Sequence, residues 1–159
     1  MNGNETWIIL TPAEILLGAV AGVMRQSTVI KKDLEGRYGE PKNNCWQRHI
    51  EGALTECAMA KHLGLYWQGK GDPGDRDLEN NEIRSAQEHY KRLMLHPRDK
   101  DDSTYWFLTG QYGRYKIHGW IIGKDGKLEE YWEKPTKDQD AAFFVPSSSL
   151  NRPGNGGMV

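Results

Sequence analysis

Residues 75–86 read DRDLENNEIRSA and concentrate charge that could hold a divalent cation. If residues 79–80 form a two-residue turn, Asp77 lies opposite Glu82 on one face of a β-hairpin, about 5 Å away. Arg84 comes two residues later and lies on the same face. Two opposed carboxylates repel one another, and a shared Mg²⁺ would relieve that repulsion. This ion binds one or two carboxylates together with water and substrate phosphate.

The same segment has a simpler explanation as a solvated hairpin tip in which Arg84 neutralises its neighbours. A calcium loop of the helix-loop-helix type is a further candidate, because acids alternate at positions 75, 77 and 79. That loop requires glycine at its sixth position and glutamate at its twelfth, where this sequence has Asn80 and Ala86. The calcium loop is therefore excluded, while the magnesium site and the charged tip both stay open.

A helix predicted over residues 46–63 carries Glu56 in an unusual position. At helical spacing this carboxylate shares a stripe of mostly small and apolar residues, namely Gly52, Ala53, Met59, Ala60 and Leu63. Small residues four positions away on either side are typical of close packing. A carboxylate in such a stripe requires a metal, a hydrogen bond or an ion pair with a core arginine such as Arg25.

In their order and spacing these motifs resemble the PD-(D/E)xK nuclease superfamily, and more narrowly its small phage-type members. The resemblance covers roughly residues 50–122. It rests on GALTECAMAKHLGLYW for the helix, DLENN for an aspartate and its turn, EIR for the acid-x-lysine element, and GWI for a later strand. It implies an α/β (α+β) fold with a restriction-endonuclease-like mixed central β-sheet flanked by α-helices. It also implies hydrolysis of DNA phosphodiester bonds with Mg²⁺, for which Mn²⁺ can substitute.

Carried over residue by residue, the resemblance assigns metal binding to Asp77, Glu82 and the backbone carbonyl of Ile83. Glu56 would bind metal-bound water or a second metal, and Arg84 stands where the family has lysine. The implied catalytic set is therefore Glu56, Asp77, Glu82 and Arg84. Lysine can shift its pKa and manage a proton, whereas arginine stays charged and offers a planar fork that clamps phosphate. This departure keeps a non-catalytic nucleic-acid- or protein-binding module on the same fold as an alternative, and a small interaction protein with a chemically inert acidic tip as a third.

Basic residues in two stretches of the sequence could contact the DNA backbone beside such a site. They are Lys31 and Lys32, and then Lys91, Arg92 and Arg98. Aspartates are interspersed with the second group, so solvated charged faces remain the alternative explanation.

Composition restricts the remaining possibilities. The 159 residues suit one domain, which we place at residues 1–148 and which is followed by a flexible tail at 149–159. A net charge of −1 means that affinity for DNA must come from a local basic patch or from a metal. Cys45 and Cys57 form neither a disulfide framework nor a zinc spacing, which indicates a reducing cytoplasm, the host's if the chain is phage-encoded. A chain this small would act as a homodimer to cut both strands of DNA.

The elements expected to position these residues are helices first and short strands afterwards. The first helix is predicted over residues 11–26, with Thr11 as its N-cap and Pro12 and Glu14 in its first turn. Its apolar stripe is expected to be buried in a soluble domain and consists of Ile15, Leu16, Ala19, Val20 and Val23. The apolar run at 15–24 is too short to span a bilayer, so no membrane association is expected. Strands are predicted at 81–86, 92–97, 104–110 and 114–123, with a possible edge strand at 128–135.

Overall fold

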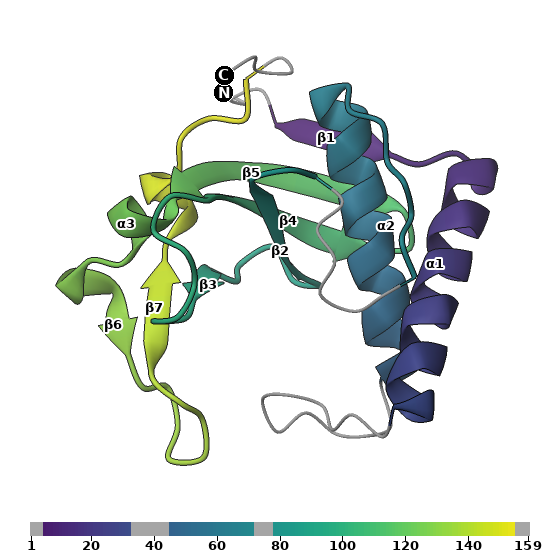
Figure 1. Cartoon of the computed structure of the whole chain (residues 1–159). Coiled ribbons are helices and arrows are strands. Elements are labelled where there is room, and N and C mark those ends of the chain that lie inside the picture. The colour runs from purple at the N-terminus through teal and green to yellow at the C-terminus, as the bar shows by residue number, and fades with distance from the viewer. Residues whose placement is uncertain (1–4, 33–44, 72–77, 155–159) are drawn as a thin grey trace. The chain divides into compact units, whose positions relative to one another are not determined.

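The computed structural model of the chain describes residues 5–32, 45–71 and 78–154 (Figure 1). Its contacts divide the chain into two compact units. The first contains Met1–Trp7, Asn80–Gly110 and Lys116–Val159, and the second contains Ile8–Glu79 and Gln111–Tyr115. The fold class is mixed α/β, as the sequence predicts, with two N-terminal helices, a four-stranded mixed sheet and a three-stranded antiparallel sheet. The predicted single domain at 1–148 stays a prediction.

The elements follow one another in this order along the chain. A short strand, β1 (Thr6–Ile9), precedes the long helices α1 (Pro12–Lys31) and α2 (Cys45–Leu63). The four-stranded sheet has the order β1-β5-β4-β2, with β2 (Asn81–Ala86), β4 (Thr104–Gln111) and β5 (Arg114–Ile122). The three-stranded sheet has the order β3-β7-β6, with β3 (Leu93–Leu95), β6 (Trp132–Glu133) and β7 (Ala142–Val145). The short helices are α3 (Gly123–Gly126), η2 (Glu129–Tyr131) and η3 (Ser147–Ser149).

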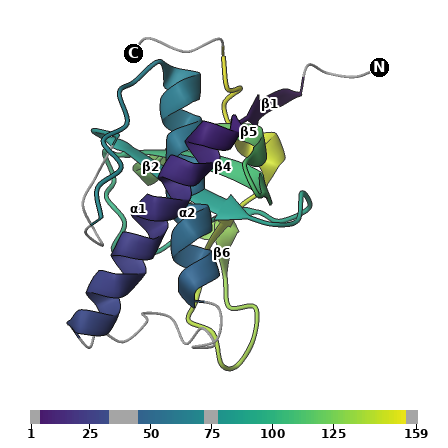
Figure 2. The ribbon, with the colours of Figure 1, turned by 90° about the vertical axis from the view of Figure 1, so that its right-hand side faces the viewer.

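Helices α1 and α2 pack against one another within the second unit (Figure 2). Gly18 and Gly22 are both buried in α1. A Cβ atom on Gly18 would lie 2.6 Å from Cδ2 of Leu54, and one on Gly22 would lie 2.4 Å from Cα of Ile50. The second contact is with backbone, which cannot rotate away as a side chain can. The two helix backbones can therefore approach this closely only because α1 has glycine there.

The prediction that the large apolar stripe of α1 is buried is wrong. Leu16 is 65% exposed, Val20 50% and Val23 41%. The buried residues of α1 are instead Gly18, Ala21, Gly22, Arg25 and Gln26. Two backbones in near contact leave no room for branched side chains between them. The small residues therefore face α2, and Leu16, Val20 and Val23 are left exposed, while Ile15 and Ala19 of the predicted stripe are half-buried.

Helix α1 begins as the sequence predicts and ends later. The Thr11 side chain accepts the backbone N–H of Glu14, and the Glu14 carboxylate accepts the backbone N–H of Thr11, which forms a complete capping box. The helix continues to Lys31 rather than ending at 26. By length and composition it is able to cross a membrane, a test that buried core helices and signal sequences also pass. The expected absence of a membrane therefore stays a prediction.

The predicted strands at 81–86, 104–110 and 114–123 are confirmed to within one residue. Strands β4 and β5 are neighbours joined at Tyr112-Gly113, where both residues have positive φ (57° and 83°), as a tight hairpin turn requires. The strand predicted at 92–97 is present but spans only Leu93–Leu95. The predicted edge strand at 128–135 spans only Trp132–Glu133. Strand β1 was not predicted, because its four residues carry no clear alternation.

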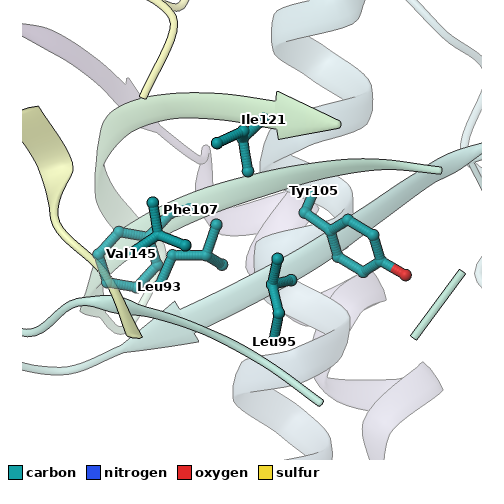
Figure 3. Close-up of a cluster of buried hydrophobic side chains, with 6 residues drawn as sticks. All are labelled: Leu93, Leu95, Tyr105, Phe107, Ile121 and Val145. Carbon is teal, nitrogen blue, oxygen red and sulfur yellow. The ribbon is translucent and has the colours of Figure 1, made fainter. Parts of the chain in front are cut away.

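A compact apolar core forms within the first unit (Figure 3). It is built from side chains of both sheets, namely Leu93, Leu95, Tyr105, Phe107, Ile121 and Val145. Leu150 packs against this core, and Asn151 exchanges backbone hydrogen bonds with Trp120. The beginning of the stretch predicted as a flexible tail is thus hydrogen bonded to β5, and residues 155–159 lie outside the described part of the chain.

Two glycine substitutions test the close approach of the helices. We expect Gly22→Ala to lower the free energy of unfolding by about 1–3 kcal/mol, the usual cost of overpacking. Gly52→Ala is the control, because a Cβ at Gly52 in α2 would meet no atom within 4 Å. It should raise the free energy by roughly 0.5–1 kcal/mol through helix propensity. Urea unfolding followed by circular dichroism measures both, and equal effects of the two variants would contradict the close contact.

Candidate functional site

Strand β2 carries the Glu82-Ile83-Arg84 element at the edge of the four-stranded sheet. Among the residues that the structure describes, β2 has β4 as its one neighbouring strand, and the two run parallel. Glu82 is in register with Tyr105, and Arg84 is in register with Phe107. Residues two apart on a strand share a face, so the carboxylate and the guanidinium project from the same side of β2.

Asn80 fixes the point at which β2 begins. Its side-chain amide donates to the carbonyl of Asp102 at 2.8 Å, and its side-chain oxygen accepts the hydroxyl of Ser103 at 3.0 Å. Its backbone carbonyl accepts the N–H of Thr104. These three bonds join the start of β2 to the start of β4 and so set the register in which Glu82 and Arg84 emerge.

The predicted turn before β2 is present in altered form. Glu79, rather than Asn80, has the positive φ, at 54°. Residues 79–80 form a turn, and Leu78 lies in a bend directly before it. Asp77, the residue expected opposite Glu82, lies outside the described residues.

The guanidinium of Arg84 is held from three directions within the first unit. Its Nη2 donates to Oδ1 of Asp99 at 3.0 Å, and its Nη1 lies 3.9 Å from Oε2 of Glu82. Its Cζ lies 5.2 Å from the centre of the Tyr105 ring. Asp99 is itself fixed, because its Oδ2 accepts the backbone N–H of His96 at 2.8 Å. Arg84 is therefore a preorganised positive charge.

Lys127 holds the loop that supplies Asp99. Its ammonium donates to the backbone carbonyls of Pro97 and Asp99 and to Oδ1 of Asp101, the last at 2.7 Å. Neither Asp99 nor Lys127 was predicted from the sequence. Nothing in their local spacing points to Arg84, because the contact joins a strand to a loop fifteen residues further along the chain. Burial and the nearby Asp99 charge both raise the pKa of Tyr105, which keeps its hydroxyl neutral beside this cluster.

Glu56 is paired with Arg25 in the second unit, which confirms the ion pair considered as one reading of the sequence. Nη1 and Nη2 of Arg25 donate to the two carboxylate oxygens at 3.0 and 2.7 Å. Arg25 Nε donates to the carbonyl of Lys70 at 3.0 Å. The side chains of Arg25 and Glu56 are 8% and 24% exposed. Such a two-point pair compensates the cost of burying the arginine. Gly52 does not serve close packing, since nothing approaches the site of its Cβ.

The four predicted catalytic residues are divided between the two units. Glu56 belongs to the second unit, Glu82 and Arg84 belong to the first, and Asp77 lies outside the described residues. The structure thus brings Glu82 and Arg84 together, and the convergence of all four stays a prediction. Within residues 5–32, 45–71 and 78–154, no group of three or more His, Cys, Asp or Glu side chains is arranged to hold a metal ion.

The predicted DNA contacts are all exposed. Lys31 and Lys32 lie at the C-terminal end of α1 in the second unit. Lys91, Arg92 and Arg98 are exposed in the first unit. Arg92 donates to Oε2 of Glu133 at 2.8 Å and covers the Phe144 ring. This ion pair means that Arg92 would contact phosphate only in competition with a carboxylate.

Two imidazoles converge on a buried hydroxyl in the first unit, a feature that sequence reasoning did not find. Oγ1 of Thr109 lies 2.5 Å from Nδ1 of His89 and 2.6 Å from Nε2 of His118. Thr109 is fully buried, and the His118 ring packs on Phe107. The His118 ring is therefore hydrogen bonded to a buried hydroxyl and packed against an aromatic side chain.

Comparisons with family models, with curated proteins and with solved structures give no match to this chain. The likeness to PD-(D/E)xK nucleases therefore stays a prediction from the motifs, and the function is argued from the site alone.

Replacing Glu56 separates a structural role from a catalytic one. We expect Glu56→Gln to lower the free energy of unfolding by about 2 kcal/mol, because Arg25 loses a charged partner in a mostly buried position. The double variant Arg25→Met/Glu56→Leu should recover much of that loss. Glu130→Gln, at an exposed position in η2, is the control. If Glu56→Gln is as stable as the wild type, the Glu56 carboxylate is not needed for stability, and a chemical role for it in the wild type is then favoured.

The pKa of His118 predicts a pH dependence of stability. Burial, and then the charge of Lys116, lower it from 6.5 to about 4. The unfolded chain therefore takes up a proton on this residue first as the pH falls. The free energy of unfolding should therefore decrease as the pH falls from 6.5 to about 4. Below about pH 4, His118 should make no further contribution to this decrease. The variant His118→Gln should flatten this slope, and a slope unaffected by His118→Gln would contradict the assignment.

Proposed function

We propose that the protein is a metal-dependent deoxyribonuclease that hydrolyses phosphodiester bonds in DNA. The observation that carries the proposal is the Glu82-Ile83-Arg84 element on edge strand β2. Its carboxylate and guanidinium share a face, lie 3.9 Å apart, and are 22% and 30% exposed at their side chains. An acid, a neighbouring carbonyl and a fixed cation are the groups that metal-assisted attack on a phosphodiester requires.

The groups on β2 suit a magnesium ion in number and kind. Mg²⁺ prefers oxygen ligands and keeps several waters, so one or two carboxylates are sufficient. Glu82 and the Ile83 carbonyl would hold the ion, with Asp77 as the second carboxylate; Mn²⁺ would substitute. Glu56 does not fit as a ligand while Arg25 engages both of its oxygens. The bound ion would polarise the phosphate and lower the pKa of its water.

Arg84 would stabilise the charge that develops on the phosphate. Its position is set beforehand by Asp99 and by the Tyr105 ring, so little reorganisation is needed when substrate binds. Arginine remains protonated at any physiological pH, so it orients and stabilises but transfers no proton. The attacking water would therefore lose its proton to solvent or to a carboxylate of the site.

A second function is favoured by the ion pairs themselves. Arg25 forms an ion pair with Glu56, and Arg84 forms an ion pair with Asp99. A non-catalytic module that binds nucleic acid or a protein would keep such pairs as structural elements and would not depend on a metal. The two functions differ in whether DNA is cut when a divalent ion is supplied.

Variants at Arg84 and Glu82 test the nuclease. In a supercoiled-plasmid nicking assay with Mg²⁺ or Mn²⁺, we expect Arg84→Lys to keep or raise the rate, because a fixed charge remains. Arg84→Ala should lose about 10²-fold or more, the scale for removing one preorganised charge donor. Glu82→Gln should abolish nicking, while Glu130→Gln, an exposed acid of the same unit, should not change it.

A binding titration in Ca²⁺ at fixed salt accompanies the nicking assay. Unchanged circular dichroism of each variant shows that it is folded. A wild-type protein that binds DNA in Ca²⁺ but never nicks it in either active metal would overturn the nuclease and support the binding module.

A further inference from the structure

Helix α1 presents an exposed apolar stripe that repeats every seven residues. We call it the α1 stripe. All of its members are exposed, namely Ala13, Leu16, Leu17, Val20, Val23, Met24, Ser27, Ile30 and Lys31. Their spacing is that of the a, d and e positions of a coiled-coil heptad. Leu16, Leu17 and Ile30 are 65%, 63% and 58% exposed.

The α1 stripe carries no charge between its ends. The only charged residue of α1 between Glu14 and Lys31 is Arg25, which is buried and paired with Glu56. The one polar side chain in the middle of the stripe, Ser27, donates its hydroxyl to the carbonyl of Val23 at 2.8 Å. A large neutral apolar surface of this kind marks an interaction site in a soluble protein.

We propose that the α1 stripe pairs with the α1 stripe of a second copy of this chain, antiparallel and about a twofold axis. The inference concerns only the second unit and does not rest on the proposed nuclease. A twofold axis makes one surface serve both partners, provided that the surface is complementary to itself.

The positions of the apolar residues meet that condition. The midpoint of α1 falls between Ala21 and Gly22, and the midpoint between Val20 and Val23 falls at the same point. An antiparallel pair centred there overlaps the two helices over their whole length. It places Val20 of one copy against Val23 of the other, and the a and d positions then interdigitate as in coiled coils.

The charges at the ends of α1 favour the antiparallel direction. Glu14 lies in its first turn, whereas Lys31 and Lys32 lie at its end. An antiparallel pair keeps the lysines of the two copies apart and brings those of one copy to the end of the other that carries Glu14, which Lys61 of the same copy already pairs at 2.9 Å. A parallel pair would instead bring the lysines of both copies together, which is unfavourable.

The size of the stripe indicates moderate affinity. A helix of 20 residues is about 30 Å long and about 10 Å wide. One such face buries an area at the small end of specific interfaces, below about 1,200 Å² in total. The dimer should therefore dissociate in the micromolar range. A lipid surface is a poorer occupant, because helices that lie on membranes combine an apolar face with a charged, basic one.

Sedimentation equilibrium of the full chain from about 1 μM to about 1 mM tests the proposal. We expect a monomer–dimer equilibrium in the wild type. The variant Val20→Glu/Val23→Glu should associate at least 100-fold more weakly, because carboxylates would be buried at the centre of the pair. Its free energy of unfolding as a monomer should be unchanged, since both positions are exposed in one copy. Tyr66→Glu, at a residue that is 86% exposed in the same unit, is the matched control and should dimerise normally.

Lys31→Glu tests the direction of pairing and should weaken association at low salt. A strengthened dimer would overturn the antiparallel arrangement. A wild type that stays monomeric throughout would overturn the proposal, as would a dimer unaffected by Val20→Glu/Val23→Glu. Flotation with vesicles of phosphatidylcholine and phosphatidylserine is measured alongside. If the wild-type monomer binds these vesicles and Val20→Glu/Val23→Glu does not, the stripe binds lipid and the proposal is overturned.

Discussion

The near contact between the backbones of α1 and α2 at Gly22 determines what each side of α1 can do. A Cβ at Gly22 would lie 2.4 Å from Cα of Ile50, so the interface admits only small side chains at this level. Arg25 follows about one turn later and reaches Glu56 across the same interface. The branched residues of the helix are thereby directed to the opposite side. One steric constraint thus accounts for a buried ion pair on one face and an exposed apolar stripe on the other.

The ion pairs redistribute the roles that the sequence suggested for the charged residues. Replacing either member of a buried pair leaves an uncompensated charge, so Glu56 is tied to Arg25 by the cost of separating them. Arg84 is tied more loosely to Asp99, since its side chain is 30% exposed. Among the described residues, the carboxylate that remains suited to an ion on β2 is Glu82. A nuclease of this kind would differ from the PD-(D/E)xK pattern both at the lysine position and in the use of the helix glutamate.

The sequence predicted those features that depend on local chemistry. The capping box at Thr11 and Glu14 and the strand at 81–86 follow from residues that are neighbours in the chain. Which face of α1 is buried could not be predicted in this way. An apolar side chain is buried only where the neighbouring helix leaves room for it, and α2 lies too close to α1 to leave such room. The clamp of Lys127 on the loop of Asp99, and the two imidazoles on Thr109, depend on contacts between distant segments. No spacing along the chain encodes those contacts.

Self-association and DNA cleavage would be connected through symmetry if both proposals hold. The two strands of a DNA duplex are related by approximate twofold axes perpendicular to the helix, and closed homodimers commonly have a twofold axis of their own. A pair of chains joined through α1 would carry two copies of the Glu82-Ile83-Arg84 element related by such an axis, so each could act on one strand. A monomer holds one copy of this element and would nick a single strand per encounter. The ratio of linearised to nicked plasmid would then rise with protein concentration in the micromolar range, where association begins. The same ratio would stay constant if each chain cleaves alone.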